Sequence, residues 1–471
     1  MVNTGQVINK SAQSIRKIIF ASSAGTIIEW YDFYIFGALA TTLAGKFYNT
    51  GSSIGDLIAW LATFAVGFMV RPFGALFFGR IGDLTGRKHT YLITIFIMAV
   101  STTGVGLLPT QETLGIWAGV ILITLRILQG LALGGQYGGA ATFVAEHSPH
   151  GKRGFYTSWI QTTATIGLFL SLSIILVTGQ VLGTAGFSSW GWRLPFLASI
   201  VLIFLSLWIR RSLKESPLFD QMKANKTISK NPLKESFTNP YNLRWIAIAL
   251  FGATMGQGVV WYTGQFYALF YLQKIFMVPL IDSNIIIGAG VLLATPLFIF
   301  FGWLSDKIGR KKIILAGMLL GVLTYYPIYG AMAAFAPTNP GQFFIFGYMG
   351  YNLVALIALV FIQVVYVTMV YGPMAAFLVE LFPTKIRYTS LSFPYHIGNG
   401  IFGGLVPIIG LAWITASGNN FAGLWYPMLI AGICFIIGLV FLKETKDVDI
   451  SDASTSISTS EEAKSRARSA H

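Results

Sequence analysis

The sequence predicts an all-α membrane protein in which twelve transmembrane helices form two pseudo-symmetric six-helix bundles. The chain of 471 residues is 54% hydrophobic and only 11% charged, whereas soluble domains carry roughly 25% charged residues. Its apolar residues fall in long blocks of about 20 residues or more, the length of helix that crosses a bilayer. Two short charged motifs also recur in register in the two halves of the chain.

Twelve apolar blocks, separated by polar loops, give the expected helices in order. They cover residues 18–45, 57–80, 90–109, 115–145, 155–181, 191–212, 245–273, 285–304, 312–335, 349–380, 389–413 and 422–442. Residues 1–212 are therefore expected to form an N-terminal bundle, and residues 245–443 a C-terminal bundle. The polar, basic segment 213–244 would be a cytoplasmic linker loop. Residues 444–471, rich in Ser, Thr and charge, are predicted to be a disordered cytoplasmic tail.

The distribution of Lys and Arg indicates which way the helices run. Of these 32 residues, Lys46, Arg193 and Lys274 fall on one side of the predicted membrane, and Arg71 and Arg126 fall inside helices. All the others lie on the second side, in the terminal segments and in the loops that follow even-numbered helices. Because basic loops stay in the cytoplasm, both termini are expected there. The net charge of +14 therefore reflects topology, and no nucleic-acid partner is predicted.

Several kinds of site and processing are not supported by the sequence. The single cysteine, Cys434, excludes an intrachain disulfide. The first apolar block begins only near Ile18 and lacks a secretory cleavage site, so no cleavable signal peptide is predicted. No Cys/His cluster has metal-ligand spacing, and no phosphate-binding Gly-rich loop follows a strand. We therefore expect no metal site, no cofactor, no catalytic residues and no ATP-driven step.

Two charged motifs occur once in each half, at equivalent places. Residues 79–88 (GRIGDLTGRK) follow the second predicted helix, and residues 302–311 (GWLSDKIGRK) follow the eighth. A further motif, an acid followed by a Pro and an Arg, comes after the fourth and tenth helices. Acid–Arg pairs at helix ends can join two helices in one conformation and separate in another. We therefore expect a gating role for Asp83, Arg87, Glu146, Arg153, Asp306, Arg310, Glu380 and Arg387. Ordinary positive charge in cytoplasmic loops is the alternative.

The pattern Gly-x-x-x-Asp-x-x-Gly-Arg-Lys resembles the best-known signature of the major facilitator superfamily, and the resemblance covers nearly the whole chain. Within that superfamily, five further segments resemble the metabolite:H⁺ symporter family. They are GTIIEWYDF at 25–33, RPFG at 71–74, RILQG at 126–130, GWRLPF at 191–196 and ESPLF at 215–219. The resemblance implies the major facilitator fold and proton-driven uptake. The family's substrates are organic acids, such as shikimate, 2-oxoglutarate and citrate, or zwitterionic osmolytes, such as proline and betaine.

One position departs from this family. Where many members have Gly-Gly-Glu-Tyr or Gly-Gly-Glu-Trp in the fourth helix, this chain has Gly134-Gly135-Gln136-Tyr137. A carboxylate is therefore missing, which argues against a coupling mechanism that needs an acid at this position.

Four charged residues lie well inside the predicted helices, all in the N-terminal half: Glu29, Asp32, Arg71 and Arg126. The two acids are three residues apart, about 60° around a helix, and so share a face. Charges inside a membrane are costly and are candidates for function. We expect Asp32 or Glu29 to bind the coupled proton, and favour Asp32 because it lies deeper from the cytoplasmic end. The alternative is a static network of charge pairs joining the first, second and fourth helices.

Arg126 lies close to one helical face with Gln129 and Gln136. Because its guanidinium can pair bidentately with a carboxylate, we expect Arg126 to recognise an organic anion. The alternative is that Arg126 pairs with Asp32 and never touches the substrate. Arg71, nearer the cytoplasmic end of its helix, is expected to serve as a gate or a structural ion pair.

The C-terminal half supplies neutral polar side chains at helical spacing, which could hydrogen-bond a small polar ligand. Ordinary helix packing is the alternative for its aromatic stripe and for its buried histidine. The predicted substrate-binding residues are Arg126, Gln129, Gln136, Tyr137, Gln257, Trp261, Tyr262, Gln265, Gln363, Tyr366, His396 and Asn399.

These features predict a proton-coupled symporter that imports a small organic acid by alternating access, as a monomer in the cell inner membrane. Its partners would be the substrate, protons and the lipid bilayer. A symporter of zwitterionic osmolytes is the alternative, because a box of Trp261, Tyr262 and Tyr267 could hold a quaternary ammonium group. A membrane enzyme would need a nucleophile–base pair or metal set that the sequence lacks. A channel fits duplicated halves with asymmetric buried charge less well than alternating access does.

Overall fold

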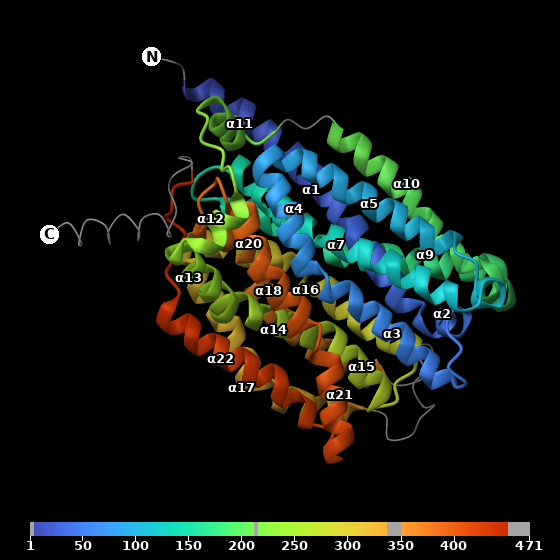
Figure 1. Cartoon of the computed structure of the whole chain (residues 1–471). Coiled ribbons are helices and arrows are strands. Elements are labelled where there is room, and N and C mark those ends of the chain that lie inside the picture. Colours follow the sequence, from blue (N-terminus) through green and yellow to red (C-terminus); the bar gives the residue numbers. More distant parts are fainter. Residues whose placement is uncertain (1–3, 212–214, 337–349, 451–471) are drawn as a thin grey trace.

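The computed structural model describes residues 4–211, 215–336 and 350–450. Within these residues the regular elements are all helices, which confirms the predicted all-α class. They form two bundles side by side, coloured blue to green and lime to red in Figure 1. Among the described residues, 10 helical stretches are long and apolar enough to cross a membrane. The pair α1–α2 and helix α10 take the places of the first and sixth predicted spans.

The bounds of the helices follow the predicted blocks closely. The N-terminal bundle contains α1 (Thr4–Ala38), α2 (Ala40–Phe47), α3 (Ser53–Met69), α4 (Arg71–Thr85), α5 (Arg87–Leu107), α6 (Gln111–Leu114), α7 (Ile116–His147), α8 (Arg153–Gln161), α9 (Thr163–Gly186) and α10 (Arg193–Arg211). The linker contains α11 (Pro217–Ala224) and α12 (Pro232–Thr238). The C-terminal bundle contains α13 (Pro240–Ala249), α14 (Met255–Tyr262), α15 (Ala268–Lys274), α16 (Leu280–Ile308), α17 (Arg310–Phe335), α18 (Gly350–Tyr371), α19 (Met374–Leu381), α20 (Arg387–His396), α21 (Val406–Ser417) and α22 (Trp425–Phe441).

Several spans are interrupted near the middle of the molecule. The second span breaks at Val70, between α3 and α4, where Pro72 stands in the first turn of α4. The seventh contains two π-helical segments, Leu250–Thr254 and Thr263–Tyr267, and the eleventh contains a third, Ile397–Gly403. A proline at the start of a helix leaves no unpaired N–H, and π-helical turns often occur at functional sites. The interruptions therefore mark a candidate region for binding.

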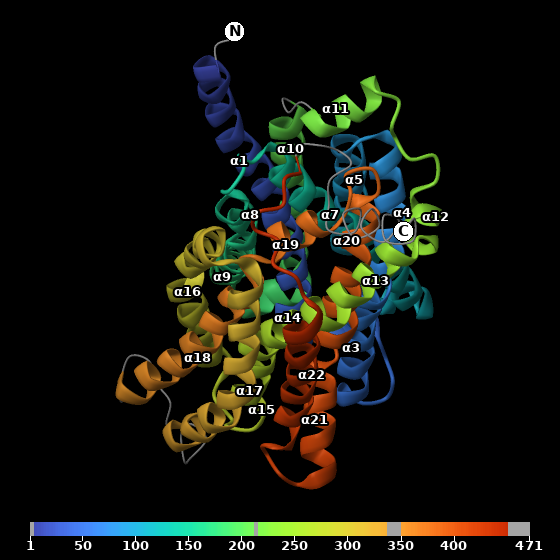
Figure 2. The ribbon, with the colours of Figure 1, turned by 90° about the vertical axis from the view of Figure 1, so that its left-hand side faces the viewer.

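The two bundles pack through equivalent helices. In the N-terminal bundle α4 and α7 contact α20, and α8 contacts α16. Small residues permit this approach, since a Cβ added to Gly154 would lie only 2.3 Å from the backbone oxygen of Gly302. Figure 2 shows α16, α17 and α18 on one side of the molecule and α3, α4 and α5 on the other. Two repeats meeting in this way form a pseudo-symmetric pair with a seam between them.

The linker differs from the loop expected at 213–244. It contains α11 and α12, and the seventh span begins at Pro240 instead of residue 245. Each of these helices starts at an N-cap side chain, Ser216, Asn231 or Asn239, that accepts a backbone N–H hydrogen bond. In each case a proline stands in the first turn, which is a typical helix start. The segment was predicted to be a loop because of its polar composition, although these N-cap and proline signals for helices are present in the sequence.

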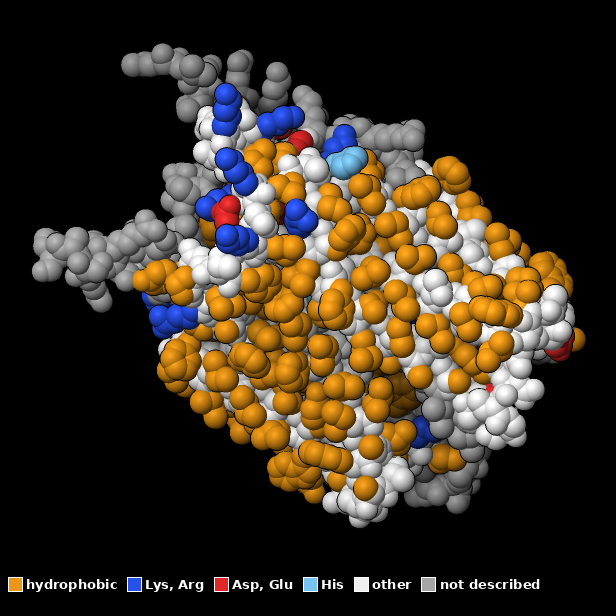
Figure 3. Space-filling view, viewed as in Figure 1, with side chains coloured by type: hydrophobic (Ala, Val, Ile, Leu, Met, Phe, Trp, Pro, Cys, Tyr) orange, Lys and Arg blue, Asp and Glu red, His pale blue; other side chains and the backbone are white. Residues whose placement is uncertain are grey.

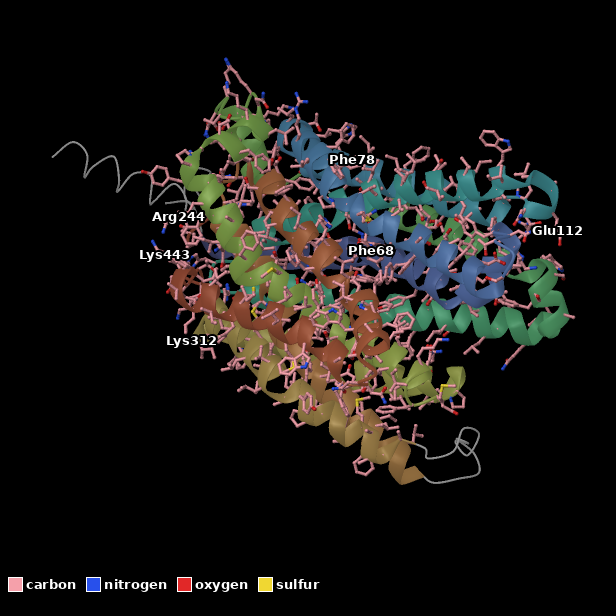
Figure 4. All side chains as sticks on the ribbon, turned by 60° about the horizontal axis from the view of Figure 1, so that its bottom comes forward. Phe68, Phe78, Glu112, Arg244, Lys312 and Lys443 are labelled. Atoms are coloured by element: carbon pink, nitrogen blue, oxygen red, sulfur yellow. The ribbon has the colours of Figure 1, made fainter. Side chains whose placement is uncertain are left out.

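One end of the molecule, which we term the basic end, carries the linker helices and the loops α4–α5 and α16–α17. Lys and Arg side chains gather there over α11 and α12, whereas apolar side chains cover most of the rest of this face (Figure 3). Arg244, Lys312 and Lys443 lie at this end, Glu112 lies at the opposite end, and Phe68 lies between (Figure 4). Residues 444–450, predicted as disordered, are described and pack against the basic end. The rest of the predicted tail, 451–471, lies outside the described residues.

Candidate functional site

A cavity within the N-terminal bundle, which we term the inner cavity, brings together the four charged residues predicted inside the membrane. It is bordered by α1, α3, α4, α5 and α7. Its lining includes Glu29, Asp32, Arg71, Arg126 and Gln129. Each of the four charged side chains is less than a tenth exposed, so their mutual arrangement decides what the cavity can do.

Asp32 is connected to Arg126 by a chain of hydrogen bonds rather than by a direct ion pair. The Thr102 hydroxyl donates to Asp32 Oδ2 at 2.7 Å, and Gln129 Nε2 donates to that hydroxyl at 2.6 Å. The Gln129 side-chain oxygen accepts from a terminal guanidinium nitrogen of Arg126. Asp32 Oδ1 is buried with no hydrogen-bond partner among the described residues. The two oxygens of this carboxylate therefore have different surroundings, one hydrogen-bonded and one without a donor.

Aromatic faces, more than carboxylates, surround the Arg126 guanidinium. Its central carbon lies 3.5 Å from the centroid of the Phe36 ring and 5.5 Å from that of Phe64. Cation–π contacts of this kind stabilise a desolvated cation by about 2 kcal/mol. Arg126 borders the inner cavity and does not line the cavity at the seam described below.

Arg71 occupies the first position of α4, directly after the break at Val70. Glycines on α7 allow this break to pack closely, since a Cβ on Gly134 would come within 2.2 Å of the Arg71 backbone oxygen. The guanidinium carbon lies 4.3 Å from the Phe68 ring centroid, and Arg71 makes no ion pair among the described residues. Arg71 thus borders the inner cavity without the structural ion pair that was one of the two expectations, and its role as a gate stays a prediction.

A second cavity, which we term the seam cavity, lies between the two bundles. Both bundles contribute to its lining, so it is the space that a movement of one bundle against the other would reshape. Its residues include Thr26, Glu29, Trp30, Arg71, Tyr137, Trp261, Tyr262, Tyr371, Tyr395, His396 and Asn399. Glu29 and Arg71 border both cavities and therefore form the wall between them.

Aromatic rings form much of the wall of the seam cavity. Tyr137 stacks on Tyr395 with ring centroids 3.5 Å apart, and the Tyr395 and Tyr371 hydroxyls are 2.8 Å apart. Trp30 packs across the seam on Trp261, with centroids 5.1 Å apart. Rings from opposite bundles thus contact each other beside the cavity, and such walls suit ligands with apolar or cationic parts.

Some of the predicted substrate-binding residues do not border either cavity. Gln257 exchanges two hydrogen bonds with Asn399, at 2.7 and 3.1 Å, which joins α14 to the π-helical turn of the eleventh span. Gln265 accepts from Tyr34 at 3.5 Å, and Gln363 donates to the Leu359 carbonyl at 3.3 Å. The five residues absent from both linings are Gln136, Gln257, Gln265, Gln363 and Tyr366. Helical spacing placed them on spans correctly but could not give the rotation of each span.

The sequence analysis did not select Thr102, Trp30, Tyr371 and Tyr395. Thr102 is the sole direct partner that the described residues supply to the Asp32 carboxylate. The available signal was weak, because Ser and Thr hydroxyls in membrane helices usually bond to their own backbone. A tyrosine pair formed between two consecutive spans, such as Tyr371 and Tyr395, has no signature in one sequence.

At the basic end, two aspartates cap helices of the opposite bundle. Asp83, at the end of α4, accepts from the backbone N–H groups of Tyr388 and Thr389 in α20, at 3.3 and 3.0 Å. Asp306, at the end of α16, accepts from those of Gly154 and Phe155 in α8, at 2.9 and 2.8 Å. A carboxylate at a helix N-terminus bonds free N–H groups and interacts favourably with the helix dipole.

Two buried glutamates form ion pairs across the same contact. Glu146 accepts from Arg387 at 2.8 Å, and Glu380 accepts from Arg310 at 3.1 Å and from Arg153 at 3.4 Å. The pairs Glu146–Arg387 and Glu380–Arg153 each join the two bundles. The side chain of Arg87, another predicted gating residue, lies outside the described residues. The basic end is therefore closed in this structure by contacts that repeat in both halves.

A further repeated pair, Glu215 and Glu444, was not recognised in the sequence. Glu215 accepts from the backbone N–H of Lys88 at the start of α5, and Glu444 accepts from that of Arg310 at the start of α17. Each helix follows a glycine with positive φ, Gly86 at 113° and Gly309 at 109°. A Cβ at these glycines would lie 2.4 and 2.2 Å from the glutamate oxygens. The glycine directly before the Arg of the motif is thus required, both by its positive φ and by the lack of space for a side chain.

Two pseudo-symmetric helical bundles, a cavity at their seam and a network that closes one end define a multi-pass membrane transporter of the major facilitator type. The chain belongs to the family described as "Sugar (and other) transporter", whose profile matches residues 17–456. The predicted superfamily is therefore confirmed.

The chain is similar to characterised transporters over nearly its full length. It is 33% identical over 460 residues to the proline/betaine transporter of Escherichia coli K12, covering 96% of this chain and 88% of that one. It is 32% identical over 442 residues to the shikimate transporter of the same strain, covering 92% and 95%. Its fold matches a proton:xylose symporter of the major facilitator superfamily with a TM-score of 0.71 at 17% identity, covering 94% and 99%.

Proposed function

We propose that this protein is a proton-coupled symporter that imports a small organic acid by alternating access. The observation that carries the proposal is the wall shared by the two cavities. Glu29 and Arg71 border both the inner cavity, where Asp32 lies, and the seam cavity between the bundles. A charge change on one side of this wall therefore acts on the other. We place the protein in the inner membrane, with the basic end and both termini in the cytoplasm.

Asp32 is the proposed proton site. Its Oδ1 has no partner in the part of the chain that the structure describes, while Thr102 and Gln129 connect Oδ2 to the Arg126 guanidinium. Loss of the negative charge on Asp32 weakens the attraction that the chain transmits to Arg126. The inner cavity can then change shape, and Glu29 and Arg71 carry that change to the seam.

For Arg126, the geometry favours the role of partner to Asp32 over direct recognition of the anion. Its guanidinium is covered by Phe36 and bonded to Gln129, and it borders the inner cavity alone. A substrate in the seam cavity would meet Glu29 and Arg71 first. In this proposal the substrate lies in the seam cavity, Glu29 and Arg71 separate it from the inner cavity, and the proton site Asp32 lies in the inner cavity.

A symporter of zwitterionic osmolytes is the second candidate. The contact of Trp30 with Trp261 and the ring of Tyr262 beside the seam cavity suit a quaternary ammonium group. The similarity to a proline/betaine transporter is consistent with this candidate, as the similarity to a shikimate transporter is with the first.

The test is uptake into proteoliposomes containing the purified full chain. We expect radiolabelled shikimate or 2-oxoglutarate to accumulate when the outside is acidified, and to leak back when a protonophore is added. Glycine betaine and L-proline are measured in parallel, and accumulation of these alone would favour the second candidate. Accumulation driven by a sodium gradient at equal pH on both sides would contradict proton coupling.

A further inference from the structure

Three side chains that border the seam cavity carry buried nitrogen atoms without hydrogen-bond partners among the described residues. They are Nε of Arg71, Nε1 of Trp261, and one ring nitrogen of His396, whose other ring nitrogen faces the backbone of Gly134. These side chains are only 8%, 2% and 2% exposed. Buried polar atoms are nearly always hydrogen-bonded, and each one left unpaired costs about 1–3 kcal/mol. Three such side chains around one cavity indicate a ligand that pairs with them.

Each of the three stands at an irregularity of its helix. Arg71 begins α4 after the break at Val70. Trp261 lies in the short helix α14, between two π-helical segments, and His396 ends α20 directly before a third. Interrupted membrane helices commonly surround substrate sites. The three side chains come from spans two, seven and eleven, so both bundles hold the same small region.

The donor and acceptor chemistry of the three groups selects the ligand. A guanidinium and an indole N–H can only donate hydrogen bonds, and a neutral imidazole has one donor and one acceptor. Arg71 also brings a positive charge, which pairs with no acid among the described residues and contacts Phe68 at 4.3 Å. A ligand group that accepts several hydrogen bonds and carries negative charge satisfies the donors of Arg71 and Trp261, whereas a donor elsewhere on the same ligand, such as a hydroxyl, would satisfy the accepting ring nitrogen of His396. A carboxylate has both properties.

We propose that Arg71 and Trp261 form the subsite that binds the carboxylate of the transported solute, with His396 beside it in the same cavity. This inference rests on the proposed function and goes beyond it by assigning the anion to Arg71 instead of Arg126. Glu29 borders the same cavity and would repel a bound carboxylate unless it held a proton. Binding of the anion at this subsite therefore favours protonation of the shared wall.

The experiment measures ligand binding to the purified full chain by thermal shift and by isothermal titration calorimetry. Two pairs of probes differ at the carboxylate: shikimate with its methyl ester, and glycine betaine with choline. We expect at least one carboxylate to bind the wild-type chain and its counterpart to bind at least about tenfold more weakly. Binding of neither carboxylate would overturn the proposed function and the subsite together.

Variants then separate the subsite from the function. We expect Arg71→Gln to weaken carboxylate binding about 10- to 100-fold and to remove the preference over the counterpart. Arg71→Lys keeps the charge but loses the bidentate guanidinium geometry, and its affinity for the carboxylate should be intermediate. Trp261→Phe removes only the indole N–H and part of the ring, and should weaken binding about three- to tenfold. If Arg71→Gln fails to fold, Trp261→Phe decides.

Trp192→Phe is the matched control. Trp192 is also fully buried with an unpartnered Nε1, but it packs against Phe47 and Phe196 and borders neither cavity. The Trp192→Phe variant should bind the carboxylate probes with the affinity of the wild-type chain. If Arg71→Gln and Trp261→Phe keep the wild-type affinity and the carboxylate preference while proton-driven uptake persists, the subsite is wrong and the proposed function stands.

Discussion

The basic end and the centre of the molecule show opposite relations between the two halves. At the basic end two kinds of contact occur in both halves, with Asp83 and Asp306 capping helices of the opposite bundle and Glu146 and Glu380 pairing with arginines. At the centre, the charged residues that border the cavities all come from the N-terminal bundle. The C-terminal bundle contributes neutral aromatic and amide side chains and His396.

The difference follows from what each region has to do. Two bundles that close against each other need complementary surfaces, and a duplicated pair of capping and ion-pairing motifs supplies them from both sides. A proton and a substrate need one site each, so a second set of buried charges would add desolvation cost without a partner. Symmetry is therefore kept at the basic end and lost around the cavities in which we propose that the ligands bind. Four predictions test this comparison, from the largest expected effect to the smallest.

Asp32→Asn should have the largest effect, because no equivalent acid in the C-terminal bundle borders either cavity. We expect proton-driven accumulation to fall to the level of passive equilibration, while exchange of labelled for unlabelled substrate continues. The measurement is uptake and counterflow in proteoliposomes. Glu112→Gln, at an exposed acid of the opposite end, is the control and should accumulate normally. Full accumulation by Asp32→Asn would place the proton elsewhere.

Breaking the pair between Glu146 and Arg387 should have the next largest effect. Both side chains are fully buried at 2.8 Å, and removing one partner of such a pair costs about 3–5 kcal/mol in the conformation that contains it. We expect Arg387→Glu to open the basic end, and the reversed pair Glu146→Arg with Arg387→Glu to close it partly again. The opening is measured as the rate at which a thiol reagent alkylates Ser158→Cys in a Cys434→Ser background. Ser158 is buried between α8 and α16.

The expected alkylation rate rises at least about tenfold in Arg387→Glu. Arg153→Ala is the comparison from the other half, because Glu380 keeps Arg310 at 3.1 Å and Thr445 at 2.7 Å. It should open the basic end less than Arg387→Glu does. An unchanged rate in both variants would show that these ion pairs do not hold the closed conformation.

Much of this comparison could be predicted from sequence, and the missing part has a physical reason. The apolar blocks predicted the helices, and the duplicated motifs predicted the equivalence of the halves and the acids and arginines at the basic end, because Gly, Asp and Arg at helix ends give a pattern that can be read in the sequence. The rotation of each span was not predictable in the same way. Gln363 and Gln265 lie on the expected spans but border neither cavity. Tyr395, which was not predicted, borders the seam cavity, and Thr102 hydrogen-bonds Asp32. When a helix is apolar on all faces, its sequence pattern does not indicate which face points towards the interior of the protein.

Replacing either capping aspartate should have smaller and similar effects. Asp83→Asn and Asp306→Asn each retain an acceptor oxygen but lose the charge that faces two backbone N–H groups of the opposite bundle. We expect each to destabilise the closed conformation by about 1 kcal/mol. The Ser158→Cys reporter and the thermal midpoint of the detergent-solubilised protein measure this change. A large effect from one aspartate and none from the other would contradict the symmetry of the basic end.

The linker should show the smallest effect, because it has no counterpart in the duplication. Lys385, between α19 and α20, pairs with Glu235 of α12 at 2.8 Å, and the two side chains are 46% and 34% exposed. Exposed pairs contribute about 0–1 kcal/mol. Burial raises the pKa of Glu235, but the hydrogen bonds from Lys385 and Ser229 and the Lys385 charge outweigh it and leave the pKa lowered. The contribution is therefore present above the ordinary carboxyl pKa and is lost as the pH falls through the lowered value.

Lys385→Gln should accordingly lower the thermal midpoint by no more than about 2 °C at pH 7, and the difference from the wild-type chain should vanish at an acidic pH where Glu235 is protonated. Lys234→Gln removes a neighbouring exposed charge on α12 for which no ion pair is found among the described residues, and should change nothing at either pH. A loss from Lys385→Gln as large as that from Arg387→Glu would mean that the linker also holds the bundles together. The closed conformation would then depend on a contact that only one half of the duplication supplies.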